Sequence, residues 1–353
     1  MDNGTLSVGP LSAAPGTKVR GTVPADLGTL TLDIPLTLVN GDRPGPRVVI
    51  TAGVHGGEFT PIDAAVRLAT LVEPAGLSGQ LIVCPVANPP AVYEGRLNVS
   101  PLDGVNINRV FPGTQDGGPT ERLAAWLFAH LVDGADVYVD LHCGGIDQLL
   151  RDFVGYRLTG NPDLDKATAE LAHSFGVEDV VLGLTAEGGN SHAAAARRGI
   201  SAVLVEVGGL GQRDEATTLR RVDGLCRALR HLGVLNPDGT AEFAGPAPAI
   251  REWVWAAGVT AEATGLWYPE VSAGDEVAEG ELLGRIADPA DGREYAVHAP
   301  AGGRIFYHMH GLTVAPGAEL AAIAAPWDPD RATESAGFHT PGVGTAPDET
   351  DPA

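Results

Sequence analysis

The alternation of strand-like and helix-like segments along residues 30–232 is the feature that most constrains the fold of this chain. Short apolar, β-branched runs at residues 30–38, 47–52, 81–86, 135–141, 177–182 and 200–207 read as strands, most of them fully buried. Between them, apolar residues recur at helical spacing at residues 60–71, 120–131, 163–175, 191–198 and 216–232. Such alternation predicts an α/β sandwich with a largely parallel or mixed sheet.

The pattern changes after this region. Residues 236–248 are rich in Pro, Gly and Ala and are typical of a linker. Beyond them, short strand-like segments and turn glycines predominate, and residues 271–286 are echoed weakly by residues 311–324. An internal repeat of this kind favours a small β domain with two similar halves.

These features predict three parts of the chain. We expect a large α/β domain at residues 1–240, a small β domain at 250–325 and a tail at 326–353. The tail is rich in Pro, Gly, Thr and acidic residues and has few large apolar ones, so we expect it to be disordered.

Charge and composition exclude several classes of partner. The chain has 45 acidic and 23 basic residues, for a formal net charge of -22, and such a chain repels nucleic acid and anionic lipid. Its start lacks the basic cluster and apolar stretch of a secretory signal, and no apolar run is long enough to span a bilayer. Three widely spaced cysteines indicate free thiols. We therefore expect a cytoplasmic protein, and a homo-oligomer is left open.

The first chemical candidate is the segment His55-Gly56-Gly57-Glu58, which follows a buried strand and precedes a helix. Ligands in open α/β sheets bind beyond the carboxyl ends of the strands. The two glycines would let the backbone turn so that both side chains face one point. Imidazole and carboxylate are good zinc ligands, although an ordinary turn explains an isolated pair equally well.

His142, in Asp140-Leu141-His142, also comes just after a buried strand. A lone histidine at such a place is usually structural. Together, however, His55, Glu58 and His142 would lie at one edge of one sheet, and two histidines with a glutamate form a catalytic type of zinc site. Asp140 could orient His142 from behind, or could cap the edge of the core.

Glu206 ends the apolar strand at residues 200–207. A carboxylate there is unfavourable unless it has a partner. It could be a helix-cap or salt-bridge residue. It could also be the general base that takes a proton from a metal-bound water and passes it to a leaving amine.

Residues 88–118 are rich in Asn, Pro and Gly and show no clear period, and so long a loop in a compact domain is usually functional. The loop carries Arg96, Asn108 and Arg109. The planar guanidinium suits carboxylates and oxyanions, which hints at an anionic substrate. Surface ion pairing is the alternative.

In their order along the chain, the motifs HGGE, NPPAVYEGRL, DGVNINRVFPG, DLH and VEVGG resemble the succinylglutamate desuccinylase/aspartoacylase family, which is related to zinc carboxypeptidases. The resemblance implies a zinc-peptidase-like three-layer sandwich with a mixed sheet and one Zn²⁺ per chain. It implies zinc ligands at His55, Glu58 and His142, and a general base at Glu206. It also implies that Arg96 polarises the scissile carbonyl and that Asn108 and Arg109 bind the substrate carboxylate.

The chain departs from the family where many members have a segment like GSLR. Here the segment is Gly189-Asn190-Ser191-His192, so a histidine stands at the place of an arginine. His192 is then expected to contact the substrate, at a neutral or differently placed group. The small β domain resembles biotinyl/lipoyl-like folds, but residues 287–294 have no lysine to carry biotin or lipoate. A lid or an oligomer contact is expected instead.

The sequence therefore predicts a zinc-dependent amidohydrolase that cleaves the amide bond of a small N-acyl amino acid or related N-acylated amine, a C–N bond other than a peptide bond. A carboxypeptidase-like peptidase and a non-catalytic metal-binding or small-molecule-binding protein are the alternatives. The acyl group, the amine and the choice of zinc over another divalent metal are left open by the residues alone.

Overall fold

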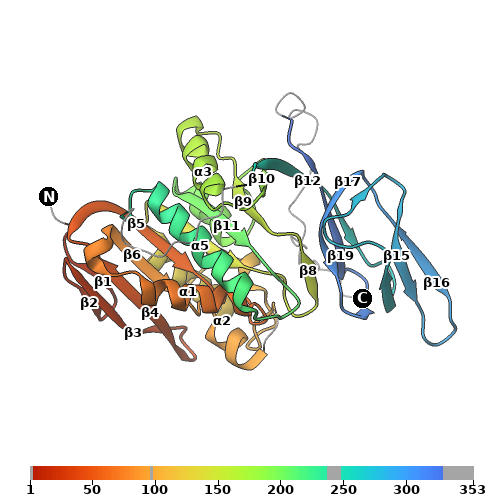
Figure 1. The fold of residues 1–353 in the computed structure, drawn as a ribbon. Helices are drawn as coiled ribbons and strands as arrows, with labels where there is room; N and C mark the ends of the chain where they lie inside the picture. The colour runs from red at the N-terminus through yellow and green to blue at the C-terminus, as the bar shows by residue number, and fades with distance from the viewer. Residues whose placement is uncertain (1–2, 96–97, 237–247, 329–353) are drawn as a thin grey trace. The chain divides into compact units, whose positions relative to one another are not determined.

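The computed structural model describes residues 3–95, 98–236 and 248–328. The chain divides into two compact units, with the boundary between Trp253 and Val254 (Figure 1). Most of the linker and of the tail expected from the sequence therefore lies outside the described residues. Among the helices of the described segments, none is long and apolar enough to cross a membrane.

The first unit alternates strands with helices. Its strands are β1 (Leu6–Val8), β2 (Leu11–Ala13), β3 (Thr17–Asp26), β4 (Thr31–Asn40), β5 (Arg43–Thr51), β6 (Ser78–Cys84), β7 (Val137–His142), β8 (Gln148–Leu150), β9 (Phe153–Arg157), β10 (Asp179–Gly183) and β11 (Ser201–Glu206). Its helices are α1 (Phe59–Leu71), α2 (Pro119–Leu127), α3 (Pro162–Ser174), α4 (Ser191–Arg197) and α5 (Glu215–His231). Short helical turns are η1 (Pro74–Gly76), η2 (Ala91–Gly95), η3 (Ile107–Arg109) and η4 (Phe128–Val132).

The main sheet of this unit runs in the order β10-β9-β11-β7-β5-β6-β4-β3. The strands β11, β7, β5 and β6 run parallel to one another, whereas β9 runs antiparallel to β11 and β4 antiparallel to β6. The predicted mixed α/β fold is therefore confirmed. The sequence interpretation contained no strand at β8 or β9, and the long loop at residues 88–118 includes the turns η2 and η3.

Helices cover the sheet because its strands have apolar side chains on both faces. One core cluster joins Val49, Ile82, Tyr138 and Ala202, from four neighbouring strands, to buried residues of α2 and α4. The helices α1 and α5 pack against each other over the strands (Figure 1). Burial on both faces explains the nearly continuous apolar runs of these strands in the sequence.

The register of the sheet brings the ends of three strands together. Thr51 of β5 is paired with Asp140 of β7, and Glu206 of β11 is paired with His142 of β7. All three strands are parallel, so their carboxyl ends, and the loops that follow them, share one edge of the sheet.

The second unit is built from strands alone in its described part. Its strands are β12 (Arg251–Thr260, which begins before the boundary), β13 (Gly265–Pro269), β14 (Glu276–Val277), β15 (Leu282–Ala287), β16 (Glu294–His298), β17 (Gly303–Met309), β18 (Thr313–Val314) and β19 (Glu319–Pro326). One sheet has the order β14-β17-β19-β12 and the other β16-β15-β13-β18. Trp267, Leu283 and Ile323 pack between them.

The internal repeat seen in the sequence corresponds to a repeated structural unit. Each copy is a two-residue strand, a turn and a longer strand: β14 then β15 in the first copy, and β18 then β19 in the second. The all-β character of this unit agrees with the sequence prediction. Its assignment as biotinyl/lipoyl-like stays a prediction.

Candidate active site

The loop after β5 carries the first two candidate ligands. Gly53 makes the turn out of the strand with a φ of 64°, a left-handed conformation that favours glycine, and a Cβ there would lie 3.0 Å from the Pro85 carbonyl oxygen. The chain also turns at Gly56 and Gly57, as expected from the sequence, although neither has a positive φ. Asn88 supports the loop by donating from Nδ2 to the Val54 carbonyl at 3.1 Å.

Three candidate ligands lie together at the end of this loop and of β7. His55, Glu58 and His142 each offer one ligand atom, and these atoms all lie within 4.8 Å of one another. His55 Nδ1 is 2.6 Å from Glu58 Oε1, and His142 Nδ1 is 3.0 Å from Glu58 Oε2. All three residues are buried. The sequence thus predicted which residues meet here.

The far nitrogen of each imidazole faces an oxygen. His55 Nε2 is 3.0 Å from Asn106 Oδ1, and His142 Nε2 is 2.9 Å from Asp140 Oδ2. An oxygen at this nitrogen holds its proton, so the Nδ1 lone pair is left for a metal. The donor set, two neutral imidazoles and a carboxylate aimed at one point, fits Zn²⁺ with a position left for water or substrate.

Electrostatics favours a cation between these groups. Burial alone would raise the pKa of Glu58, but His55 and His142 outweigh it and lower that pKa to about 2. Burial would likewise lower the pKa of His142, but Asp140 and Glu58 raise it well above its ordinary value. A proton on His142 therefore balances the buried carboxylates when no metal is bound, and a bound metal would displace it.

Asp140 is the centre of a buried hydrogen-bond network behind His142. Its Oδ1 accepts from Thr51 Oγ1 at 2.6 Å, and its Oδ2 accepts from Ser191 Oγ as well as from His142. Tyr138 adds a hydroxyl 2.7 Å from Thr51 Oγ1. Burial would raise the pKa of Asp140, but His142 and these hydrogen bonds keep it lowered. Of the two roles open to Asp140 in the sequence, the structure shows contact with His142.

Glu206 lies at the end of β11, beside His142 of β7. Its Oε2 is enclosed and has no hydrogen-bond partner among the described residues. Burial raises the pKa of Glu206 to about 8, and repulsion from Glu58 contributes, although His142 and Arg221 oppose the shift. A carboxylate without a partner and with a pKa near neutrality is suited to accept and return a proton.

Arg221 of α5 holds the two strand ends that carry His142 and Glu206. Its guanidinium is buried and donates to the carbonyl oxygens of His142 at 2.6 Å and of Val205 at 3.1 Å, and also to that of Val207. These carbonyls lie at the carboxyl ends of β7 and β11, and a buried carbonyl without a donor is unfavourable. Arg221 therefore fixes the spacing of the two strand ends.

The long loop places Asn108 against the cluster. Asn108 is buried, with Nδ2 3.4 Å from His142 Nε2 and Oδ1 accepting from the Ser191 backbone N–H at 2.9 Å. Arg109 is half-buried and donates to the Asn108 carbonyl at 3.0 Å. Arg96, the predicted carbonyl-polarising residue, lies outside the described residues.

The segment before α4 places His192 near the same cluster. His192 is buried, and Arg157 of β9 donates to its Nε2 at 3.3 Å. Arg157 also donates to Asn190 Oδ1 at 3.2 Å. Sequence reasoning missed Arg157 because it lies on a short strand that contains a glycine and has no motif around it. Arg221 was missed for the same lack of a local signal. Asn106 and Ser191 lie in segments that the sequence marked as candidates, but their supporting contacts were not predicted.

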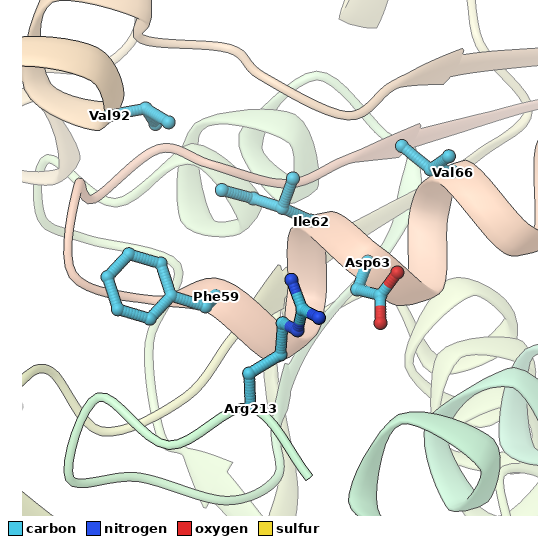
Figure 2. A pocket seen from close by; sticks show the side chains of 6 residues that line it. All are labelled: Phe59, Ile62, Asp63, Val66, Val92 and Arg213. Atoms are coloured by element: carbon cyan, nitrogen blue, oxygen red, sulfur yellow. The ribbon is translucent and has the colours of Figure 1, made fainter. Parts of the chain in front are cut away.

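A separate hollow lies beside α1, outside the cluster of candidate ligands. It has a volume of about 550 Å³ and is lined by Phe59, Ile62, Asp63, Val66, Val92 and Arg213 (Figure 2). Its wall is largely apolar and contains none of the candidate ligands. Its lining begins at Phe59, the residue after Glu58, and continues along α1 to Val66, which is exposed.

Comparison with known proteins agrees with this geometry. The model of the succinylglutamate desuccinylase/aspartoacylase catalytic domain matches residues 44–232. The chain belongs to this family. The match covers β5 to α5 and therefore includes all the candidate ligands and Glu206. As a member of the family, the protein is an amide-bond hydrolase of the deacylase type.

Among curated members of the family, N-alpha-acetyl-L-2,4-diaminobutyric acid deacetylase from Halomonas elongata is 31% identical over 262 residues, which is 72% of this chain and 74% of that protein. Among solved structures, a succinylglutamate desuccinylase/aspartoacylase from Rhodobacter sphaeroides matches with a TM-score of 0.78 and 28% identity, over 88% of this chain and 96% of that one. The product-bound structure of the ectoine utilization protein EutE (DoeB) from Ruegeria pomeroyi matches with a TM-score of 0.78 and 25% identity, over 92% of this chain and 100% of that one.

Proposed function

We propose that this protein is a zinc-dependent deacylase that hydrolyses the amide bond of a small N-acyl amino acid. The observation that carries the proposal is the convergence of His55 Nδ1, His142 Nδ1 and the Glu58 carboxylate, with Glu206 beside them. Zinc held by these three residues would supply Lewis acidity, which polarises an amide carbonyl and makes water a stronger nucleophile near neutral pH.

The residues of the chain divide the remaining work. Glu206 would take the proton of the attacking water and return it to the leaving amine, because its raised pKa lets it hold that proton between the two steps. Asp140 and Asn106 would keep the two histidines in the tautomer that a metal needs. Asn108 and Arg109 would bind the substrate carboxylate, and Arg96 would stabilise the oxyanion, an effect typically worth about 3 kcal/mol.

For the substrate, we favour an N-acetylated amino acid with a cationic side chain. The relative from Halomonas elongata acts on an N-acetyl derivative of a diamino acid, as its name states. The net charge of -22 on this chain would repel a dicarboxylate, but not such a substrate, whose carboxylate and ammonium charges cancel. A panel of N-alpha-acetyl-diaminobutyrate, N-acetylaspartate and N-succinylglutamate is expected to give the highest kcat/KM for the first compound.

The variant Glu206→Gln tests the reaction itself. The amide keeps the shape of the side chain but cannot accept the proton, so we expect turnover to fall by about 10²–10⁴-fold while the zinc content stays at the level of the wild type. Glu215→Gln is a suitable control, because Glu215 is an exposed residue that pairs with Arg67 on the surface. Unchanged turnover in Glu206→Gln would exclude Glu206 as the base.

The same panel, extended with peptides longer than a dipeptide, tests the alternatives. A carboxypeptidase-like enzyme would prefer peptides longer than a dipeptide over N-acetyl amino acids. A binding protein would bind these compounds without releasing acetate or succinate. Either result would replace the proposed function.

A further inference from the structure

A buried arginine and a buried histidine form a pair next to the candidate active site. Arg157 ends β9, and His192 is in the first turn of α4. Both are buried, and Arg157 Nε donates to His192 Nε2 at 3.3 Å. Ser191, the residue before His192, connects the pair to the candidate site, because it donates from Oγ to Asp140 and from its backbone N–H to Asn108.

The contact determines where the proton of His192 lies. A guanidinium has only donors, so His192 Nε2 must accept and cannot carry a proton. Burial, together with the charge of Arg157, lowers the pKa of His192 well below its ordinary value, which keeps the imidazole neutral. A neutral imidazole with an unprotonated Nε2 has its proton on Nδ1.

That Nδ1 has no hydrogen-bond partner among the described residues, although it is buried. Buried donors are nearly always satisfied, and one left without a partner is unfavourable by about 1–3 kcal/mol. An acceptor that arrives with the substrate would supply the missing bond. The positive charges of Arg197 and Arg109, which together with burial lower the pKa of Arg157 to about 10, favour an anion at this corner.

The neighbouring strand leaves room for the guanidinium. Gly183 of β10 is paired with Arg157 in the sheet, and a Cβ at Gly183 would lie 2.4 Å from Arg157 Cδ. The φ of Gly183 is not in the left-handed region, so a glycine is required here for space and not for conformation. The position of the Arg157 side chain is thus built into the sheet.

We propose that Arg157 is a positioning residue that holds His192 in its Nδ1–H tautomer, so that His192 presents a neutral hydrogen-bond donor to a carboxylate oxygen of the substrate. The identity of that oxygen rests on the proposed function, whereas the tautomer does not. Because Arg157 is cationic, the same corner disfavours an ammonium group. The cationic side chain of a diamino acid would therefore bind at another end of the site.

Histidine NMR tests the tautomer directly. The full-length, zinc-loaded protein is labelled with ¹⁵N in its histidine rings, and the His192 signals are assigned by their loss in His192→Asn. We expect a protonated Nδ1 and an unprotonated Nε2 in the wild type, and a protonated Nε2 in Arg157→Met. A protonated Nε2 in the wild type, or the same tautomer in Arg157→Met, would overturn the proposal.

Two further variants separate this effect from damage to the fold. Gly183→Ala keeps the charge of Arg157 but displaces its side chain, so it is expected to change the His192 signals in the same direction as Arg157→Met. Arg198→Met removes an exposed arginine at the end of α4 and is expected to leave them unchanged. If Arg198→Met changed the tautomer as strongly, the role assigned to Arg157 would be wrong.

Kinetics test what the donor does. In His192→Asn the amide can place an N–H near the Nδ1 position, whereas in His192→Gln it reaches the Nε2 position. We expect KM within about threefold of the wild type for Asn, and KM raised about tenfold or more for Gln and Leu, with kcat little changed. A fall in kcat at unchanged KM, or a better rescue by Gln than by Asn, would overturn the assigned contact. If the wild type hydrolysed no compound of the panel, the proposed function would fail, and the NMR result would still decide the role of Arg157.

Discussion

Replacing Asp140 by asparagine should weaken zinc binding, although Asp140 is not itself a candidate ligand. The carboxylate accepts from His142 Nε2 through one oxygen and from Thr51 through the other. Asparagine has a single oxygen and must turn its NH₂ group toward one of these partners. If the NH₂ group faces His142, the ring must carry its proton on Nδ1, where the metal would bind.

The size of the effect follows from these contacts. If the asparagine amide instead turns its oxygen toward His142, the bond to His142 is kept but the negative charge that supports it is lost. Both orientations of the amide therefore lower zinc affinity. Loss of such a supporting carboxylate typically weakens metal binding by about 10–100-fold, which corresponds to about 1.4–2.7 kcal/mol. Because a neutral amide is more easily buried than a carboxylate, the metal-free protein should not lose stability to the same extent.

Competition with a fluorescent chelator measures the zinc affinity of Asp140→Asn and the wild type. Thr51→Val is the matched control, because it removes a hydrogen bond to Asp140 but leaves the contact with His142 in place. We expect the control to stay within about threefold of the wild type. Equal zinc affinity in Asp140→Asn and the wild type would show that Asp140 does not orient His142 for the metal.

Three further perturbations follow from the structure. Arg221→Met removes the buried donor of three carbonyl oxygens and should reduce the free energy of unfolding in urea by about 3–5 kcal/mol. The control Arg220→Met, at an exposed neighbour, should change it by less than about 0.5 kcal/mol, and equal effects would contradict the role of Arg221. The pKa of Glu206 is raised from 4.5 to about 8 in the folded protein, so between these pH values the folded state binds a proton that the unfolded chain has released. The zinc-free wild type should therefore lose stability relative to Glu206→Gln as the pH rises from about 4.5 to about 8. A constant difference between their free energies of unfolding in urea across this range would exclude the shift. Gly53→Ala should lower the free energy of unfolding by about 1–2 kcal/mol, because alanine is strained at this left-handed φ, and should also weaken zinc binding, because the turn places His55. The control Gly160→Ala has a similar φ in open space and should leave zinc affinity unchanged in the same chelator assay.

The main elements of the fold could be predicted from the sequence because its central strands are buried on both faces. Continuous apolar runs such as residues 47–52 and 200–207 stand out against the helical periodicity of the segments between them. The meeting of His55, Glu58 and His142 could be predicted for a related reason. Each follows a strand at its carboxyl end, and parallel neighbours place those ends at one edge.

The residues that support the site could not be predicted in the same way. Arg157 reaches His192 only because β9 runs antiparallel beside β11, and strand order is not encoded in any local pattern. Arg221 lies mid-helix in α5, where an arginine usually faces solvent, and its burial depends on how α5 packs. The turn at Gly56 and Gly57 could be predicted because these glycines adjoin the ligands, but no pattern marked Gly53, nearer the strand, as the left-handed residue of the loop.

The central claim is that His55, Glu58 and His142 hold a zinc ion on which amide hydrolysis depends. The most direct test measures the zinc content of the purified protein together with hydrolysis of N-alpha-acetyl-diaminobutyrate before chelation, after chelation and after zinc is restored. We predict about one zinc per chain, loss of activity with the metal and recovery on its return, and little zinc in the variant His142→Ala. Activity that survives complete removal of metal, or full zinc content in His142→Ala, would contradict the claim.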